Sequence, residues 1–428
     1  MTALPFNLLP ETAAVDPDGM LLIGGCRMDD LAQEHGTPLF VYDETHLRAR
    51  CREAVAAFPD GVSYATKAFL CGAMARLAHE EGMRLDVSTG GELGYALAAG
   101  IPADRLVFHG NNKSDDELRE ALGAEVGQLV IDSAAEIDRI EMMIAEGLRP
   151  PRVMIRVNPG VEAHTHEFLR TGTVDSKFGI PVESGAAASA MKRAARSGSM
   201  ILEGVHAHVG SQVFDVGFFE KALSVIAEFV GEFDVEELSI GGGLGVAYVE
   251  GEEAPSITDW GKVLAAAARS AGIRARLVAE PGRSIVAKAA ITLYTVGVIK
   301  EIPGIRTYVA VDGGMSDNPR PVLYGSGYEV FAPASTNADR TREIRLVGKH
   351  CESGDVLARN GMVPESVAVG DLLATPVTGA YGHSMGSNYN MVRRPAVVFA
   401  GDGDARLVVR RETYQDLWSR DLVIAPGV

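Results

Sequence analysis

The sequence has 428 residues, of which 46% are hydrophobic and 23% charged, and its formal net charge is −17 at pH 7. The length predicts a globular protein of two domains, and the negative charge argues against nucleic acid and anionic membranes as partners. No apolar run approaches the roughly 20 residues that cross a membrane, and the N-terminus lacks a basic segment, so we expect a cytoplasmic protein. The four cysteines lack the spacings of zinc sites and redox motifs, and we expect no metal.

The first 38 residues are punctuated by proline, glycine and aspartate, and their apolar run at 20–23 predicts an edge strand. From Leu39 onward, short β-rich runs alternate regularly with amphipathic segments rich in alanine, glutamate and arginine. Eight such units predict a parallel (β/α)8 barrel over residues 39–285. The predicted strands are 62–66, 84–88, 106–109, 129–132, 153–158, 204–209, 237–240 and 277–280.

The pattern changes after Arg283, where alternating apolar and polar residues replace the helical segments. Strands are predicted at 291–298, 307–311, 343–347, 396–399 and 406–409, and a helix only at 412–420. Residues 1–38 plus 286–428 are therefore expected to form a mainly antiparallel β-domain. Within the barrel, the insertion at 164–181 is long enough to predict a functional loop.

Several chemically distinctive residues follow the C-terminal ends of predicted barrel strands. Lys67 follows the first strand, Asp86 ends the second, His206 and His208 end the sixth, and Glu280 ends the eighth. Alone, each has an ordinary explanation, as a solvated lysine, a core histidine or a carboxylate paired with Arg283. In a barrel, however, these tips meet at one mouth. Together they indicate pyridoxal phosphate, an aldehyde cofactor whose pyridine nitrogen a carboxylate can keep protonated.

The seventh strand ends in the glycines Gly241, Gly242 and Gly243, whose backbone N–H groups can approach an anion closely. Ser211 and Arg283 could add a hydroxyl and a positive charge. Because the loops after strands seven and eight of such barrels often bind phosphate, we expect the cofactor phosphate here. Tight turns also need glycine, so the run by itself is ambiguous.

The predicted β-domain supplies further candidates in its polar turns. Arg320, near Tyr324, follows an Asp-Asn-Pro turn and suits bidentate binding of a carboxylate. Cys351 lies beside Glu352, and Tyr381 lies between small residues. Polar turns are common in β-domains, so none of these predicts a function by itself.

The sequence resembles a known family, the fold-type III pyridoxal-phosphate decarboxylases, which share their architecture with alanine racemase. The resemblance rests on Tyr64 to Lys67, His208 to Gln212, the Gly241 to Gly243 run, and Glu280 to Arg283. Within that family, further segments resemble the diaminopimelate decarboxylase branch. These are 108–114, 158–161, 312–320, 351–355 and 379–382. The matching positions run from about residue 38 to 415, nearly the whole chain.

The resemblance implies a role for each matching residue. Lys67, Cys351 and His208 would be catalytic, with Lys67 bound covalently to pyridoxal 5′-phosphate and His208 stacked on its ring. The implied cofactor residues are Lys67, Asp86, His208, Ser211, Gly241, Gly242, Gly243, Glu280, Gly282, Arg283 and Tyr381. The implied substrate residues are Arg283, Arg320, Tyr324, Glu352 and Tyr381.

The resemblance also implies a homodimer with two shared active sites, because Cys351 and Glu352 of this family reach the partner's site. Cys351 would donate a proton to the substrate carbon, and Glu352 would bind the distal ammonium group. An acidic neighbour favours a protonated thiol, which suits a proton donor.

The implied reaction is the decarboxylation of meso-2,6-diaminopimelate to L-lysine and carbon dioxide, the last step of lysine biosynthesis. Arg320 favours a substrate with a second carboxylate, because a diamine-forming relative would need acidic residues there instead. A related basic amino-acid decarboxylase and, less strongly, a non-catalytic homologue remain alternatives. A racemase on the same fold would need a tyrosine as its second base.

Overall fold

The structure is a computed structural model that describes residues 4–161 and 175–424. The chain divides into two compact units. The barrel unit comprises Arg50–Val246 and Ala254–Ser284, and the sheet unit comprises Met1–Ala49, Ala247–Glu253 and Ile285–Val428. The functional loop predicted at 164–181 lies largely outside the described residues, apart from its end at 175–181.

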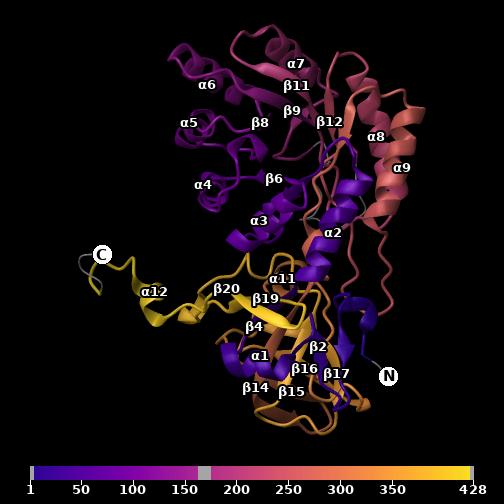
Figure 1. Ribbon diagram of the computed structural model, residues 1–428, viewed down its shortest axis with the longest axis vertical. Helices are drawn as coiled ribbons and strands as arrows, with labels where there is room; N and C mark the ends of the chain where they lie inside the picture. Colours follow the sequence, from indigo (N-terminus) through magenta and orange to yellow (C-terminus); the bar gives the residue numbers. More distant parts are fainter. Residues whose placement is uncertain (1–3, 162–174, 425–428) are drawn as a thin grey trace. The chain divides into compact units, whose positions relative to one another are not determined.

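The barrel unit is built on parallel strands that pair in chain order, several of which are labelled in Figure 1. The strands are β5 (Ser63–Ala65), β6 (Arg84–Val87), β7 (Leu106–Phe108), β8 (Gln128–Ile131), β9 (Arg152–Asn158), β11 (Ile201–His206), β12 (Glu237–Ser239) and β13 (Arg276–Val278), and the short β10 (Ile180–Pro181) pairs with β9. Closure is made between the last and first strands, where the Ser63 N–H donates to Ala279 O at 2.9 Å and the Ala65 N–H to Pro281 O at 3.1 Å. The predicted (β/α)8 barrel is thereby confirmed.

Helices follow the barrel strands along the chain because capping residues start them just after the strand tips. Thr89, Ser114, Ser133 and Ser256 each accept a backbone N–H of the first turn, which satisfies a donor that has no partner within the helix. The helices are α2 (Glu44–Ala57), α3 (Gly72–Glu80), α4 (Gly90–Ala98), α5 (Asp115–Gly123), α6 (Ala134–Ala145), α7 (Ala186–Arg196), α8 (Val216–Val230), α9 (Ile257–Ser270) and α10 (Arg283–Val286), with 3-10 turns η2 (Thr66–Ala68) and η3 (Ala103–Arg105).

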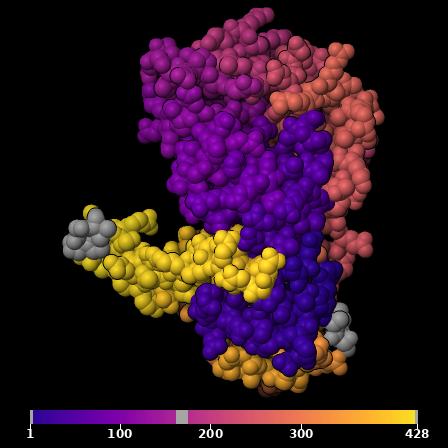
Figure 2. Space-filling model, in the orientation of Figure 1, coloured from indigo at the N-terminus to yellow at the C-terminus, as the bar shows by residue number. Residues whose placement is uncertain are grey.

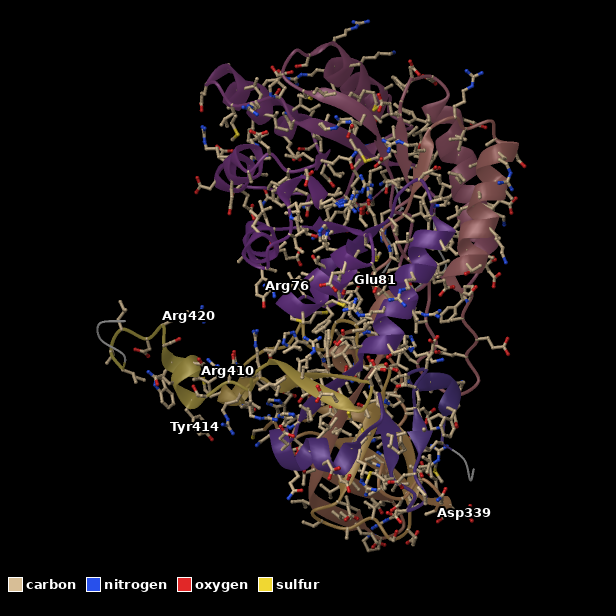
Figure 3. The ribbon with its side chains drawn as sticks, in the orientation of Figure 1. Arg76, Glu81, Asp339, Arg410, Tyr414 and Arg420 are labelled. Carbon is tan, nitrogen blue, oxygen red and sulfur yellow. The ribbon has the colours of Figure 1, made fainter. Side chains whose placement is uncertain are left out.

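Polar contacts tie neighbouring helices of the barrel unit together. Arg76 of α3 donates to the Ala99 carbonyl at the end of α4 at 2.8 Å, and Glu81, which follows α3, pairs with Arg52 of α2 at 2.7 Å; Arg76 and Glu81 are labelled in Figure 3. Among the described residues, no helix is long and apolar enough to span a membrane.

The amino-terminal ends of the barrel strands are closed by a charged network. Glu237 pairs with Arg84 at 3.0 Å and with Arg276 at 3.2 Å, and Glu203 pairs with Arg152 and accepts from Gln128. These residues line a cavity of about 290 Å³. The network lies at the end of the barrel opposite the strand tips that carry Lys67. Its charged side chains pair with one another and close this end, and active sites of such barrels lie at the other end.

The sheet unit contains a mixed, mainly antiparallel sheet in the order β17-β16-β15-β14-β4-β19-β20, with β18 paired to β14. Its strands are β4 (Leu39–Asp43), β14 (Ala290–Ile302), β15 (Arg306–Val311), β16 (Arg340–Val347), β17 (Val356–Pro364), β18 (Leu372–Pro376), β19 (Ala396–Gly401) and β20 (Asp404–Val409). A small antiparallel sheet joins β1 (Ala14–Val15), β2 (Leu21–Ile23) and β3 (Cys26–Arg27). The two sheets share one hydrophobic core, in which Leu21 and Ile23 pack with residues such as Phe331 and Val398.

The helices of the sheet unit are short. They are η1 (Phe6–Leu8), α1 (Met28–His35), α11 (Arg320–Tyr324), η5 (Tyr389–Met391) and α12 (Tyr414–Trp418). The C-terminal segment with α12 lies apart from the sheets of its own unit (Figures 1 and 2), and Arg410, Tyr414 and Arg420 mark it in Figure 3. Leu422 and Val423, which follow α12, are 80% and 90% exposed.

The unit boundaries differ from the predicted ones in two places. Leu39–Asp43 forms β4, which pairs with β14 and β19 of the sheet unit, and residues 247–253 also belong to that unit. An apolar run such as 39–43 suits either sheet, and its partners lie some 250 to 360 positions away, which the local pattern cannot reveal. The structure also adds β17, β18 and α11, which the sequence did not predict.

Candidate functional site

Lys67 lies in a turn that hydrogen bonds from the residues before it hold in place. It lies in η2, between the buried residues Thr66 and Ala68, and its own side chain is exposed. The Thr66 hydroxyl donates to Asp86 O at 2.8 Å, and the Tyr64 hydroxyl donates to Phe69 O at 2.6 Å. These bonds hold the turn against the neighbouring strand, so the lysine amine projects from a rigid base.

Gly282 allows the loop after β13 to pack against this turn. A Cβ atom at Gly282 would lie 2.9 Å from the carbonyl oxygen of Ala65 and 3.0 Å from its Cβ atom, closer than real contacts allow. Only glycine therefore permits this approach.

Glu280 lies buried at the tip of the eighth strand with a donor at each carboxylate oxygen. The Ser239 hydroxyl donates to Oε1 at 2.8 Å, and His206 Nε2 lies 3.0 Å from Oε2. His109 Nε2 lies 3.5 Å from Glu280 Oε1 and 3.6 Å from Asp86 Oδ1, between two buried carboxyl groups. The mouth thus contains a histidine pair for which the sequence predicted no role, although His206 was expected at this strand tip.

The two carboxyl groups carry opposite pKa shifts. Burial alone would raise the pKa of Glu280, but His206, with the hydrogen bonds from His206 and Ser239, holds it well below its usual value. Burial lowers the pKa of His109 well below its usual value, so this neighbouring ring stays neutral. Burial raises the pKa of Asp86 well above its usual value, and the charge of Glu280 adds to the rise. One negative charge is therefore concentrated on Glu280.

The ligand-type atoms of His109, His206 and Glu280 lie within 4.8 Å of one another, a spacing that could also hold a metal ion. No cysteine or histidine spacing in the sequence predicted this group, because its members come from three different strand ends.

His208 is fixed as a neutral ring at the same mouth. Its Nδ1 accepts the Gly242 N–H at 3.1 Å, which places the ring proton on Nε2. Desolvation by burial, followed by the charges of Lys67 and Arg156, lowers its pKa well below the usual value. A neutral, oriented imidazole offers a flat face for stacking.

The loop after β12 can adopt its conformation only because residues 241–243 are glycines. A Cβ atom would lie 2.6 Å from His208 Nδ1 at Gly241, 2.4 Å from Glu280 O at Gly242 and 2.2 Å from Gly210 O at Gly243. The Gly241 N–H donates to Ser239 Oγ and the Gly242 N–H to His208, so these two amides bind side chains of the barrel.

Positive charge and a hydroxyl lie beside this run. Arg283 is buried, and its Nη2 donates to Ser211 Oγ at 3.2 Å. The barrel residues predicted for the cofactor therefore gather at one end of the barrel unit, at its strand tips.

Arg320 lies in the sheet unit in a cage of hydroxyls and rings. It is 2% exposed, and it donates to the Tyr328 hydroxyl at 3.0 Å and to Ser326 Oγ at 3.1 Å. Its guanidinium lies 4.0 Å from the Tyr248 ring centroid, and its Nε has no hydrogen bond. Within the described part of the chain, no carboxylate pairs with Arg320.

Cys351 is a free, exposed thiol on a turn of the sheet unit. Its N–H donates to Asn390 Oδ1 at 3.1 Å, and Asn390 Oδ1 also lies 3.3 Å from His350 Nδ1. The neighbouring Glu352 is exposed, and its carboxylate accepts the Gly354 N–H at 3.2 Å. The turn thus presents a thiol and a carboxylate side by side on the surface of the unit.

Tyr381 and Tyr324 lie in the same unit as Arg320. Tyr381 has a φ of 64°, a left-handed conformation that costs energy for a tyrosine and that here is held between Gly379 and Gly382. Tyr324 ends α11 and is half-buried. The predicted site residues thus form a barrel group and a sheet-unit group. Ser239 carries no local motif and was not predicted, whereas His206 was placed at a strand tip and His109 within the matching segment 108–114 without a role for either.

A closed parallel barrel with a lysine and a buried ionised carboxylate at its strand tips, together with a second unit built on a mixed β-sheet, defines the class of pyridoxal-phosphate enzymes with an alanine racemase-like fold. In agreement, the family described as "Pyridoxal-dependent decarboxylase, pyridoxal binding domain" matches residues 44–287.

Whole-chain relatives narrow this class. The chain is 46% identical to diaminopimelate decarboxylase of Mycobacterium tuberculosis, covering 97% of this chain and 98% of that protein. It is 44% identical to the Bacillus subtilis enzyme of the same name, over 98% and 99% of the two chains. A solved structure of diaminopimelate decarboxylase from M. jannaschii superimposes with a TM-score of 0.90 at 32% identity, over 97% and 98% of the two chains. The chain belongs to the diaminopimelate decarboxylase family.

The residues at the barrel mouth fit the family's cofactor. Lys67 offers an exposed amine for an aldehyde, and Glu280 offers a buried ionised carboxylate for a protonated ring nitrogen. Asp86 Oδ1 is buried without a hydrogen bond, as expected beside a polar ligand. The glycine run and Arg283 suit a phosphate.

Proposed function

We propose that this chain decarboxylates meso-2,6-diaminopimelate to L-lysine and carbon dioxide with pyridoxal 5′-phosphate. Support comes from the family and from the names of relatives that match almost the whole chain. A further relative from M. jannaschii, 33% identical with a TM-score of 0.89, was solved in co-complex with L-lysine, the product in this proposal. A cytoplasmic location, expected from the sequence, fits a step of amino-acid biosynthesis.

The barrel residues would bind and tune the cofactor. When bound, pyridoxal phosphate supplies an electron sink for the electron pair that remains as carbon dioxide leaves. Lys67 would hold its aldehyde carbon, and His208 would pack its neutral ring against the pyridine. Glu280 would keep a proton on the ring nitrogen. Ser211 and Arg283, with the backbone amides of Gly243 and Gly282, would hold the phosphate, while the amides of Gly241 and Gly242 hold Ser239 and His208.

The observation that carries the substrate assignment is the environment of Arg320. A guanidinium stays charged inside proteins, and burying it without a counter-ion is costly. Arg320 is buried among hydroxyls and rings and has no carboxylate partner among the described residues. A carboxylate from the substrate would supply the missing charge in bidentate geometry. Diaminopimelate has a distal carboxylate, whereas ornithine and lysine do not.

The sheet unit would complete the site of a partner subunit. We place Cys351 as the donor of the proton that replaces carbon dioxide on the substrate carbon, and Glu352 as the ligand of the distal ammonium. Tyr381 and Tyr324 would contact the substrate near Arg320. Both Cys351 and Glu352 are exposed, as residues that reach another subunit must be. The exposed apolar side chains of Leu422, Val423 and Ile424 also suit burial in a homodimer.

The test is carbon dioxide release from meso-diaminopimelate, measured beside ornithine, arginine and lysine at equal concentration. We expect release from diaminopimelate alone, and a purified yellow protein whose colour borohydride bleaches. Arg320→Gln should raise KM for diaminopimelate by about tenfold or more, because a charge-assisted pair is lost. Faster release from ornithine or lysine would identify the related decarboxylase instead, and no release from any of them would identify a non-catalytic homologue.

A further inference from the structure

The carboxylate of Glu280 is held by two side chains whose own orientation is fixed. Ser239 Oγ donates to Oε1 and at the same time accepts the Gly241 N–H at 3.2 Å, so its hydroxyl proton points at the carboxylate. His206 Nε2 faces Oε2 at 3.0 Å, and because a carboxylate only accepts, His206 must donate. Each oxygen of Glu280 therefore keeps lone pairs for a ligand after receiving one donor from the protein.

The hydrogen bond to Glu280 is the polar contact that the described residues give the His206 ring. Its Nδ1 is buried and has no hydrogen bond, and the ring is 1% exposed. A histidine that served packing alone would not need to lose a hydrogen bond at one nitrogen while donating from the other. The ring therefore serves to hydrogen-bond Glu280.

His109 separates Glu280 from the second buried carboxyl group, Asp86. The rings of His109 and His206 meet edge to face, with centroids 4.9 Å apart. The loop that carries His109 is held by Lys113, whose ammonium donates to Gly110 O at 2.9 Å and to Val130 O at 2.7 Å. Lys67, Arg156 and His208 also act electrostatically on this pair of carboxyl groups.

We propose that His206 and His109 are positioning residues that keep the single negative charge of this cluster on Glu280, facing the ring nitrogen of the cofactor. His206 does so through its hydrogen bond, and His109 does so by standing between Glu280 and Asp86. This inference rests on the proposed function, in which Glu280 pairs with that nitrogen. It adds two residues that act through Glu280 and touch neither the aldehyde nor the phosphate.

The experiment compares the affinity of cofactor-free protein for pyridoxal phosphate with its affinity for a carba analogue in which C–H replaces the ring nitrogen. Both ligands have the same aldehyde and phosphate, so bonding to Lys67 and phosphate binding cancel in the ratio. The variants are His206→Leu, His109→Leu and Glu280→Gln, with His206→Gln as the conservative change. His79→Leu, in α3 of the same unit, is the control.

We expect the wild-type protein to prefer the native cofactor. Glu280→Gln should lose that preference, and His206→Leu should reduce it about 10- to 100-fold, the value of a hydrogen bond to a charged group. His109→Leu should reduce it in the same direction. His206→Gln, which keeps a donor, should restore part of it, and His79→Leu should leave it unchanged.

The outcomes separate this inference from the proposed function. If Glu280→Gln keeps the wild-type preference, the pairing of Glu280 with the ring nitrogen fails and the inference falls with it. If Glu280→Gln loses the preference but His206→Leu weakens both ligands equally, His206 is only structural and the inference alone is overturned. If the leucine variants do not fold, His206→Gln and Ser239→Ala test the inference instead. Each should lower the ratio of the affinity for pyridoxal phosphate to that for the carba analogue below the wild-type value. Ser239→Ala does so by removing the donor at Oε1.

Discussion

Two buried carboxyl groups of this protein show how neighbouring donors decide the charge of a single residue. Glu280 has donors at both oxygens, and its pKa is held well below the usual value. Asp317 in the sheet unit accepts from the Gly314 N–H and the Tyr294 hydroxyl, yet burial, which outweighs these bonds, raises its pKa to about 7. Two nearby carboxylates, Asp355 and Asp312, add to the rise. Burial alone therefore does not set the charge.

The raised pKa of Asp317 predicts a pH-dependent cost to stability. Above about pH 4 the unfolded chain ionises at this residue, while the folded chain stays protonated until about pH 7, so stability falls as pH rises through this window. Between pH 5 and 8 the loss should be about 2–3 kcal/mol. Asp317→Asn should remove it, and its melting temperature relative to wild type should rise by several degrees from pH 5 to pH 8. If the difference in melting temperature between Asp317→Asn and wild type were the same at pH 5 and pH 8, this assignment would be wrong.

Cys351 allows a second prediction at the residue scale. If it donates the proton to the substrate carbon, Cys351→Ala should lower kcat about 10²-fold or more. The cofactor absorbance should stay unchanged, because the proposed cofactor residues other than Tyr381 lie in the barrel unit. Ser353→Ala, in the same exposed turn, is the matched control and should keep normal turnover. Normal turnover of Cys351→Ala would reject the proton-donor role.

At the scale of elements, the segment that leads to Arg320 and the turn that carries Cys351 are joined by one buried carboxylate. Asp355 accepts the Met315 N–H at 2.6 Å and the His350 N–H at 2.9 Å. His350 Nε2 also lies 2.8 Å from Ser316 Oγ. These contacts explain Gly314, where a Cβ atom would lie 2.7 Å from Asp355. The two elements should therefore move together.

Asp355→Ala should loosen both elements at once, because each loses the acceptor of a buried backbone amide. Hydrogen exchange should become faster in peptides covering 312–320 and 348–355. The control is Asp371→Ala, which removes an exposed acceptor of the Ala368 N–H in the same unit and should affect only its own peptide. Faster exchange in one of the two elements alone would show that Asp355 does not couple them.

At the scale of the whole molecule, the proposed homodimer with shared sites predicts complementation between two inactive variants. In a mixed dimer of Lys67→Ala and Cys351→Ala subunits, one site would have both defects and the other would have neither. Random pairing of equal amounts should therefore restore about a quarter of wild-type activity. When the two variants are unfolded, mixed and refolded together, they should recover carbon dioxide release that neither variant shows alone. If the mixture stays as inactive as its parents, each site lies within one subunit.

Much of the barrel was predictable because its pattern is local. Short apolar runs between capped helices identified all eight barrel strands within a few residues, and the chemistry was expected at their tips. Strands β17 and β18 were missed because their burial does not alternate cleanly, as in β18, where four of five residues are buried. The placement of β4 was missed because strand partners are set over long distances.

The residues with matching motifs, such as Lys67, Glu280 and the Gly241 run, could be proposed from sequence alone. Ser239 could not, and His206 could only be placed at a strand tip without a role, because they are 41 and 74 positions from Glu280 and their hydrogen bonds to it form only in the folded barrel. The sequence by itself determined the order of elements and the identity of the reactive groups, since both depend on local periodicity and residue chemistry. Only the tertiary structure decided which carboxyl group is charged and which cation has no carboxylate partner among the described residues, because burial and hydrogen bonding belong to the folded surroundings.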